Sequence, residues 1–480
     1  MSIEQNILDI FEQISAVPRA SKQEQRISEW LQNWAARHGH QAHTDDAGNL
    51  VIRVGATPGY EDAPTIVLQG HMDMVCEKTP DSKHDFTKDP IRCIREGDWL
   101  HADQTTLGAD NGIAIALALA LVENTEIVHP PLELLFTVEE ETGLGGAALL
   151  QKGFVRGKIL VNLDSEEDGV FIVGCAGGVK SVIQLPVTYL PAQRDEKAYV
   201  IHVTGLQGGH SGGDVNKNRA SANKLLTRML DAILQKVPLR IAAVKGGSAH
   251  NAIAREAQAT ILMNEKHRPE LDLLLAEYGK VLQDEFAGIE DSISFSLTED
   301  DARQAATEED SRKMVALLEG LPHGVSKMSS TVEGFVETSN NLAVIEAGAD
   351  GLLIVTSQRS MLASQLEEIT RRIESIAYLS GAQVSRGSHY PAWKPRMDSP
   401  LLKRSSQIYE NLFGAAPQIA TIHAGLECGV IGEIYEDMDM LSLGPTILDP
   451  HSPQERLHVP SVLKVWDFLV ALMESYAVKD

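Results

Sequence analysis

The chain has 480 residues, of which 43% are hydrophobic, so it is long enough for more than one domain with a sizeable core. Its formal net charge of −25 argues against nucleic acid or an anionic membrane as a partner. The sequence shows no secretory signal and no run of about 18 apolar residues that would span a membrane. The 4 cysteines never form a Cys-x-x-Cys motif, so we expect a reduced, cytoplasmic protein.

Hydrophobic periodicity predicts amphipathic helices over residues 4–18 and 22–38. Strand-like and helix-like segments then alternate between about 48 and 164, which is typical of an α/β architecture. A segment over 113–122 is apolar nearly all round, and we expect it to form a helix packed on the sheet. Apolar strands that end on metal-ligand residue types are predicted at 65–70, 134–138, 159–163 and 441–444.

The middle of the chain has a different layout. It contains a strand at 200–204, then a glycine-rich loop and a helix at 219–235. A series with the same layout follows about 150 residues later. The counterpart consists of a strand at 351–356, a polar loop at 357–360 and a helix at 364–379. This weak internal repeat suggests an α+β domain made of two related halves.

The candidate metal ligands lie on both sides of this middle domain, because His451 follows it in the sequence. We therefore predict a catalytic domain formed by residues 1–178 and 392–480. Residues 179–391 are predicted to form an inserted domain.

Histidine and acidic side chains follow the predicted strands, where ligands bind in α/β sheets. His71 and Asp73 follow the first of these strands, and a carboxylate near a ligand histidine can fix its tautomer. The alternative is that His71 and Asp73 are an ordinary histidine and aspartate on the surface. Asp110 precedes an apolar helix and could bridge two ions through its two oxygens, although a helix N-cap is the other interpretation. Together these residues suggest a metal site for two ions.

Glu139, Glu140 and Glu141 follow another strand, where three adjacent like charges repel each other unless cations neutralise them. One of them can be a ligand and a neighbour a general base, while an exposed acidic turn is the alternative. Asp164 ends a further strand, and His451 lies in a proline-flanked loop.

Two features suggest substrate contacts. His210 lies in a glycine-rich loop that lets the backbone approach a ligand closely, although such loops are often only turns. Arg359 could bind a carboxylate bidentately, although most arginines are simply solvated. No His-Glu-x-x-His motif occurs, which disfavours a single-zinc protease of that type.

The ordered motifs resemble the di-zinc peptidases and deacylases related to aminoacylase, carboxypeptidase and carnosinase. The resemblance spans essentially the whole chain and rests on the following motifs: His71-x-Asp73, Asp110-Asn111-Gly112, Glu140-Glu141-x-Gly143, Asp164, Gly-Gly-His210-Ser-Gly and His451-x-x-x-Glu455. Further segments resemble the bacterial aminoacyl-histidine dipeptidases (peptidase D), namely Asp164-Ser-Glu-Glu, Gly174-Cys-Ala-Gly-Gly178, His423-Ala-Gly-Leu-Glu-Cys-Gly429 and His451-Ser-Pro.

This resemblance implies a fold and a ligand set. The fold would be a catalytic α/β domain, with a mixed sheet flanked by helices, and an inserted α+β, ferredoxin-like lid domain. His71, Asp110 and Asp164 would hold one Zn²⁺, and Asp110, Glu141 and His451 the second. Co²⁺ and Mn²⁺ would be possible substitutes. The Asp110–Asn111 peptide bond would be cis.

The resemblance also implies roles for the remaining site residues. Asp73 would orient His71, and Glu140 would be the general base. Family members commonly form homodimers through the lid, and His210 would then stabilise the transition state at the partner's site. The implied substrate contacts are Asn251, Arg359, Gly425 and Glu427. One departure is Glu139, where relatives often carry Asp.

From these residues and the resemblance we expect a cytoplasmic enzyme that hydrolyses dipeptides. A preference for Xaa-His dipeptides, including β-alanyl-histidine, follows from the resemblance alone. An aminoacylase or another di- or tripeptidase on the same scaffold is the nearest alternative. A non-catalytic binding protein of the same fold is an alternative from a different class.

Overall fold

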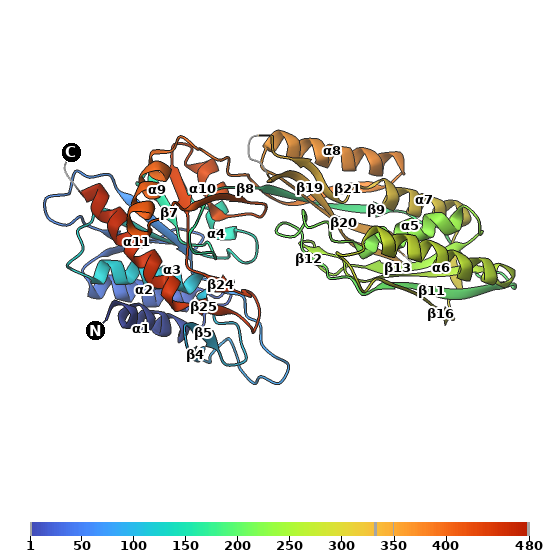
Figure 1. Ribbon diagram of the computed structural model, residues 1–480, viewed down its shortest axis with the longest axis horizontal. Helices are drawn as coiled ribbons and strands as arrows, with labels where there is room; N and C mark the ends of the chain where they lie inside the picture. Colours follow the sequence, from blue (N-terminus) through green and yellow to red (C-terminus); the bar gives the residue numbers. More distant parts are fainter. Residues whose placement is uncertain (1, 331–333, 349, 478–480) are drawn as a thin grey trace. The chain divides into compact units, whose positions relative to one another are not determined.

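The computed structural model describes residues 2–330, 334–348 and 350–477 (Figure 1). The chain forms two compact units. The first unit comprises residues 1–175, 393–421 and 426–480, and the second comprises 176–392 and 422–425. The segment 422–425 is a short return of the chain to the second unit.

An eight-stranded sheet forms the centre of the first unit, in the order β1-β2-β6-β3-β7-β23-β8-β22. Its four central strands run parallel to one another: β6 (Leu132–Thr137), β3 (Ile66–His71), β7 (Ile159–Asn162) and β23 (Asp439–Ser442). Their carboxyl ends therefore meet at one edge of the sheet, which is where α/β sheets bind ligands. The remaining strands are β1 (Gln41–Thr44), β2 (Leu50–Val54), β8 (Val170–Cys175) and β22 (Gln418–Ile422).

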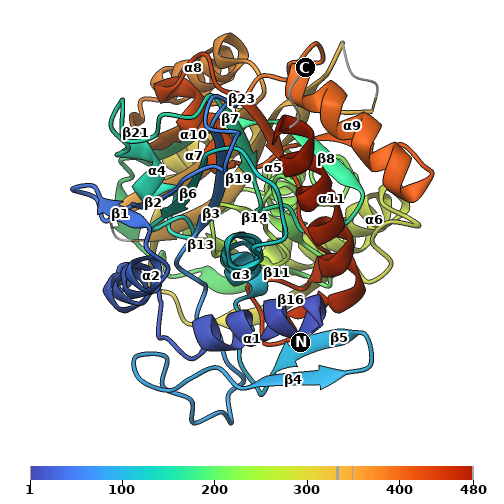
Figure 2. The ribbon, with the colours of Figure 1, turned by 90° about the vertical axis from the view of Figure 1, so that its left-hand side faces the viewer.

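Helices cover this sheet and share one hydrophobic core with it (Figure 2). α3 (Ala109–Glu123) is rich in alanine, leucine and isoleucine and is buried on nearly all sides. α1 (Ile3–Ser15) buries one apolar stripe against α3, and the Ser2 hydroxyl caps it by accepting from the Gln5 N–H. The other helices are α2 (Gln25–Arg37), α4 (Gly145–Ala148), α9 (Pro400–Phe413), α10 (Glu427–Ile434) and α11 (Val459–Ala477).

A small four-stranded sheet completes the first unit, in the order β24-β25-β5-β4. It pairs two strands of the amino-terminal part with two of the carboxyl-terminal part, so the unit closes only when both parts meet. The bounds are β4 (Cys93–Glu96), β5 (Trp99–Ala102), β24 (Ile447–Leu448) and β25 (Arg456–His458).

The second unit contains a nine-stranded sheet in the order β16-β11-β15-β13-β19-β20-β9-β21, with β18 also paired to β19. Four helices lie on one face of it (Figure 1), namely α5 (Ala222–Leu234), α6 (Arg268–Glu285), α7 (Glu308–Gly320) and α8 (Ala363–Leu379). The strands are β9 (Gly177–Leu185), β11 (Glu196–Thr204), β13 (Arg240–Gly246), β15 (Ala257–Asn264), β16 (Ser294–Asp300), β18 (Gly324–Met328), β19 (Val336–Gly348), β20 (Gly351–Ser360) and β21 (Gln383–Tyr390).

Antiparallel pairing of β13 with β19 joins the two halves of this sheet. One half carries β11 and α5, and the other carries β20 and α8, which are the two strand–helix pairs of the internal repeat. Two ladders also lie beside the sheet: β10 (Tyr189–Pro191) with β17 (Gln304–Ala306), and β12 (Gly209–His210) with β14 (Ala252–Ile253).

The mixed α/β class predicted from the sequence is confirmed. One local prediction was wrong: residues 357–360 are not a loop, because β20 continues to Ser360 with its polar side chains buried. The short exposed strand β1 was not predicted. No helix within the described ranges is both long and apolar enough to cross a membrane.

Candidate functional site

The strand ends of the first unit bring together residues that are far apart in the sequence. His71 is the last residue of β3, and Asp164 follows β7 by two residues. Asp110 lies in the first turn of α3, and its non-helical backbone shows that it is not an ordinary helix residue. Single ligand atoms of His71, Asp110 and Glu141 all lie within 4.8 Å of one another. Residues from distant parts of the sequence thus form one candidate metal centre.

Asp110 stands between two sets of donor atoms. Its Oδ1 lies 3.0 Å from His71 Nε2, which is also 3.4 Å from Asp164 Oδ1. Its Oδ2 lies 3.1 Å from His451 Nε2, which is 3.0 Å from Glu141 Oε2. The two oxygens of one carboxylate therefore face different histidines, each with a further carboxylate of its own.

The electrostatics of this cluster favour positive charge. Burial alone would lower the pKa of His71, but Asp164 and the hydrogen bonds to its carboxylate neighbours raise it well above the ordinary value. Hydrogen bonds to Asp110 and Glu141 raise the pKa of His451 to about 11. The Glu141 Oε1 atom is buried without a hydrogen-bond partner. Imidazole nitrogens and carboxylate oxygens are the ligands of catalytic zinc sites, so these residues fit a pair of divalent cations.

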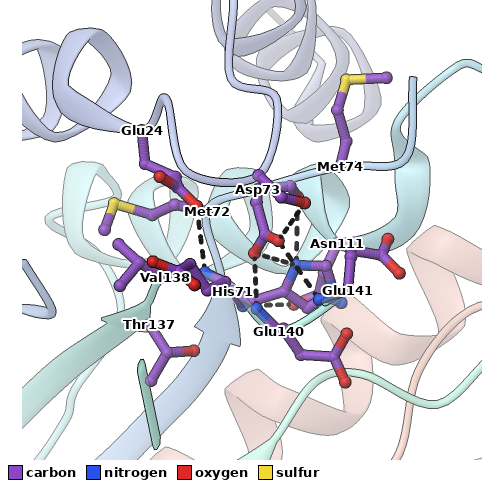
Figure 3. A network of polar contacts seen from close by, with 12 residues as sticks. Glu24, His71, Met72, Asp73, Met74, Asn111, Thr137, Val138, Glu140 and Glu141 are labelled. Carbon is purple, nitrogen blue, oxygen red and sulfur yellow. Dashed lines mark hydrogen bonds and ion pairs between the residues drawn. The ribbon is translucent and has the colours of Figure 1, made fainter. Parts of the chain in front are cut away.

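Asp73 connects His71 with the glutamate segment (Figure 3). Its Oδ1 lies 3.3 Å from His71 Nδ1, and its two oxygens accept from the N–H groups of Glu140 (3.1 Å) and Glu141 (3.2 Å). The Ser21 hydroxyl donates to Oδ2 at 2.8 Å. A ligand histidine commonly has such a carboxylate on its second ring nitrogen. Asp73 is thus placed to fix the His71 ring and the turn that carries the two glutamates.

Glu140 lies beside the cluster and is not part of either donor set. Burial, followed by the charge of Asp164, Glu141 and Glu427, raises its pKa well above the ordinary value. A carboxylate with a raised pKa is a stronger proton acceptor, which suits a general base. The preceding Glu139 has a left-handed backbone with φ 54°, a conformation in which Asp is more common than Glu.

The sequence analysis missed a buried polar network beneath the site. Gln69 Nε2 donates to Glu427 Oε2 at 2.6 Å, and Thr137 Oγ1 donates to the same oxygen at 2.7 Å. Asn162 Nδ2 donates to Gln69 Oε1 at 2.6 Å. Burial raises the pKa of Glu427 to about 7. The sequence signal that could have revealed this network is the presence of polar residues inside otherwise apolar strands.

The second unit contains a different cluster, which includes Arg359. This side chain is 5% exposed, its Nη1 donates to Tyr390 OH at 2.6 Å, and its Nε has no hydrogen-bond partner. No carboxylate pairs with it among the described residues. Burial and then Lys180 and Arg359 lower the pKa of His250, while burial, Arg359 and His210 lower that of His423 to about 3. The cluster is therefore cationic and suited to an anion.

Three further expected substrate contacts also lie in the second unit, whereas Glu427 is the first residue of α10 in the first unit. His210 is exposed in β12, and its Nδ1 accepts from the Gly213 N–H at 3.1 Å. Asn251 is exposed next to β14, which pairs with β12. A Cβ atom on Gly425 would lie 2.8 Å from Cε2 of Tyr390, so the ring of Tyr390 already requires glycine there. Ser339, whose Oγ lies 2.7 Å from His423 Nε2, was not predicted.

The peptide bond between Asp110 and Asn111 is cis, as the sequence resemblance implied. The Asn111 side chain spans two strand ends, because its Oδ1 accepts from the His71 N–H and its Nδ2 donates to the Leu163 carbonyl.

Residues 67–475 match the model of peptidase family M20/M25/M40. The chain is 38% identical to the cytosol non-specific dipeptidase of Escherichia coli (strain K12) over 478 residues, which cover 99% of this chain and 98% of that protein. It is similar to the crystal structure of aminoacylhistidine dipeptidase from Vibrio alginolyticus, with a TM-score of 0.87, 38% identity and coverage of 99% and 98%.

Human carnosine dipeptidase 1 has the same fold with a TM-score of 0.52, at 14% identity and with coverage of 99% and 97%. The family match and the full-length relatives extend over both units and include every candidate metal ligand. The chain therefore belongs to peptidase family M20/M25/M40.

Proposed function

We propose that the protein is a dipeptidase whose first unit holds two Zn²⁺ ions. The observation that carries this proposal is the position of Asp110, whose two carboxylate oxygens face His71 and His451 separately. Relatives named as dipeptidases over the full length of the chain support the reaction class. We further propose that Xaa-His dipeptides, including β-alanyl-histidine, are preferred and that the enzyme is cytoplasmic.

The proposed ligands are His71, Asp110 and Asp164 for one ion and Asp110, Glu141 and His451 for the other. Bound divalent ions supply Lewis-acid charge that acidifies water and polarises a carbonyl. Co²⁺ or Mn²⁺ would suit the same nitrogen and oxygen donors. Glu140 accepts a proton from the attacking water on its carboxylate and delivers it to the leaving nitrogen. Asp73 keeps the imidazole of His71 in one orientation.

The second unit supplies substrate contacts in this proposal. Arg359 binds the C-terminal carboxylate of the dipeptide, because a buried guanidinium without a carboxylate partner favours an anionic ligand. In the homodimer proposed below, His210 stabilises the negative charge that develops on the scissile carbonyl oxygen at the site of the partner protomer. Asn251 and Gly425 of the second unit and Glu427 of the first complete the proposed substrate contacts.

Replacement of Glu140 tests the reaction. Glu140→Gln keeps the shape of the side chain and removes its basicity, so kcat for alanyl-histidine should fall by about 10²–10⁴-fold. Zinc per chain should stay at the wild-type value. The control is Glu126→Gln, which removes an exposed carboxylate from the first unit. Full activity of the Glu140 variant with zinc retained would exclude the base assignment.

A substrate panel separates the dipeptidase from an aminoacylase on the same scaffold. The proposal predicts hydrolysis of alanyl-histidine and β-alanyl-histidine by the zinc-loaded protein, with little hydrolysis of N-acetyl-histidine. Faster cleavage of the N-acetyl compound would favour the aminoacylase. Failure to cleave any of them, with zinc bound, would favour a binding protein.

We also propose a homodimer formed through the second unit. Tyr378 and Leu379 at the end of α8 are 81% and 84% exposed, which is unusual for large apolar side chains. Sedimentation analysis of the wild type and of a Tyr378→Glu, Leu379→Glu double variant tests the assembly. The wild type should sediment as a dimer and the variant as a monomer. A monomeric wild type would exclude the proposal.

A further inference from the structure

The loop that carries Asp110 is held by Glu455, a residue that belongs to neither donor set. Glu455 Oε2 accepts from the N–H groups of Leu107 (2.7 Å) and Gly108 (2.9 Å). Its Oε1 accepts from the N–H of Asp110 at 3.2 Å. The side chain is 2% exposed, so little water competes for these bonds. Hydrogen bonds from backbone N–H groups to a carboxylate are among the strong ones.

Arg19 holds the same loop through its carbonyl groups. Its Nη2 donates to the Gly108 carbonyl, and its Nη1 donates to the carbonyls of Met72 (3.0 Å) and Asp73 (2.9 Å). Arg19 is 1% exposed. One guanidinium therefore connects the segment after β3, which contains Asp73, with the loop before Asp110.

The close approach of Arg19 depends on a glycine. A Cβ atom on Gly108 would lie 2.5 Å from Arg19 Nη2, and the φ angle of 70° at Gly108 also disfavours any other residue. The left-handed backbone and the close contact with Arg19 therefore both require the glycine that the sequence has at position 108.

Glu455 also links the loop to the second half of the first unit. It follows His451 by four residues, and its own N–H donates to the Ser452 carbonyl at 3.0 Å. The backbone around His451 and the carboxylate that grips the Asp110 loop are thus parts of one short segment. Arg19 and Glu455 together connect the three segments that carry His71, Asp110 and His451.

We propose that Arg19 and Glu455 are positioning residues that set the metal affinity of the site by holding Asp110 between His71 and His451. The proposal rests on the ligand set given under Proposed function. Outer partners of this kind change metal affinity by about 10- to 100-fold when they are removed. Neither residue is one of the proposed metal ligands or substrate contacts.

The opposite charges of the two residues allow a decisive test. If the two residues acted only through long-range charge, removing the positive Arg19 would tighten cation binding and removing the negative Glu455 would weaken it. Positioning predicts weaker binding in both cases. Arg19→Lys adds a second distinction, because it keeps the charge but cannot reproduce the guanidinium fork.

The experiment measures the zinc affinity of the metal-free full-length protein by competition with a chromogenic chelator. We compare the wild type with Arg19→Lys, Arg19→Met and Glu455→Gln, with Glu126→Gln as the matched surface control. We expect about 10- to 100-fold weaker zinc binding in all three site variants and no change in the control. Unchanged affinity in Arg19→Lys, or tighter binding in Arg19→Met, would overturn the proposal.

Two further readouts keep the result interpretable. Circular dichroism of the metal-free variants checks the fold, and the isosteric Glu455→Gln and charge-conserving Arg19→Lys decide the question if Arg19→Met does not fold. Adding zinc in excess should restore most of kcat in the positioning variants, because the reacting groups are intact. A wild type that binds zinc but cleaves no dipeptide would contradict the proposed function and leave the affinity comparison valid.

Discussion

The two units carry clusters of opposite charge. In the first unit, carboxylates outnumber the two histidines, and hydrogen bonds to the carboxylates raise the pKa of His451 to about 11. In the second unit, burial and Arg359 lower the pKa of His423 to about 3. The same residue type is thus driven in opposite directions by its neighbours. One cluster suits cations and the other an anion, although the whole chain has a net charge of −25.

This contrast shows that the overall charge of a protein says little about its sites. The acidic excess agrees with the first cluster but gives no indication of the second. Buried charges require a partner of opposite sign, and the sign of that partner is set locally.

Removing the carboxylate shared by the two donor sets should have the largest effect. Asp110→Asn leaves each proposed ion with one fewer charged ligand, so zinc per chain should fall from two to below one. The loss of several kcal/mol of charge stabilisation corresponds to a decrease of about 10³-fold in kcat/KM. Metal analysis and kinetics measure the two effects. Asp46→Asn, an exposed carboxylate of the same unit, is the control, and an Asp110 variant with two zinc ions would refute the bridge.

Removing the metal should destabilise only the first unit. Ligand binding stabilises the folded state by about 2.7 kcal/mol when free ligand is 100 times its Kd. The two units have separate hydrophobic cores, so hydrogen exchange can follow each one. After chelation we expect faster exchange in β3, β7 and α3 and unchanged exchange in β11 and α5. Equal acceleration in both units would contradict the assignment of the ions to the first.

Removing the charge of the cationic cluster should raise KM more than it lowers kcat. Arg359→Met removes a charge-assisted hydrogen bond to the substrate carboxylate, which contributes about 1.5–3 kcal/mol, so KM should rise by roughly 10- to 100-fold. Arg312→Met, an exposed arginine in the same unit, should behave like the wild type. Dipeptide amides, which lack the carboxylate, should not distinguish the Arg359 variant from the wild type. A KM increase for the amides as well would point to a structural role.

The smallest expected effect is a pH dependence of stability in the second unit. Burial, assisted by Lys224, lowers the pKa of His323 from 6.5 to about 4, and its Nδ1 accepts from the Leu342 N–H. The unfolded chain therefore binds a proton first as the pH falls from 6.5 to 4, and stability is lost in this window. The loss is at most about 1.4 kcal/mol per pH unit.

His323→Asn removes the titrating ring and should flatten this dependence relative to the wild type. Denaturant unfolding of the two proteins at pH 7 and pH 4.5 measures the difference. If the free energy of unfolding falls equally in both proteins between pH 7 and pH 4.5, the ring of His323 titrates normally in the folded state.

The candidate metal ligands stand out in the sequence because their signal is local. A strand that ends on His71, a strand that ends before Asp164 and a row of three glutamates can each be recognised in the sequence. The parallel pairing of β3, β6, β7 and β23 then brings the ends together, as expected for an α/β sheet. Asp110 was ambiguous, because an acid before an apolar helix is also a common N-cap.

The cationic cluster was harder to predict because Arg359 lies inside a strand. Ser357–Ser360 is polar, and polar residues were interpreted as a loop, yet these side chains are buried in β20. Only the register with β9 and β19 shows where their hydrogen bonds are made. Gln69 and Asn162 escaped notice for the same reason. The partners of such residues are distant in sequence, so local patterns do not reveal them.

The chain leaves the first unit after Cys175 and re-enters it at Trp393. Cys175 and Trp393 exchange two backbone hydrogen bonds of 3.0 Å, so the ends of the intervening 176–392 segment are antiparallel neighbours. A turn of a few residues would span the same gap, as in an ordinary β-hairpin. The whole nine-stranded module is therefore joined to the first unit at a single hairpin-like crossing, and the hydrophobic core of the first unit contains no residue of that module.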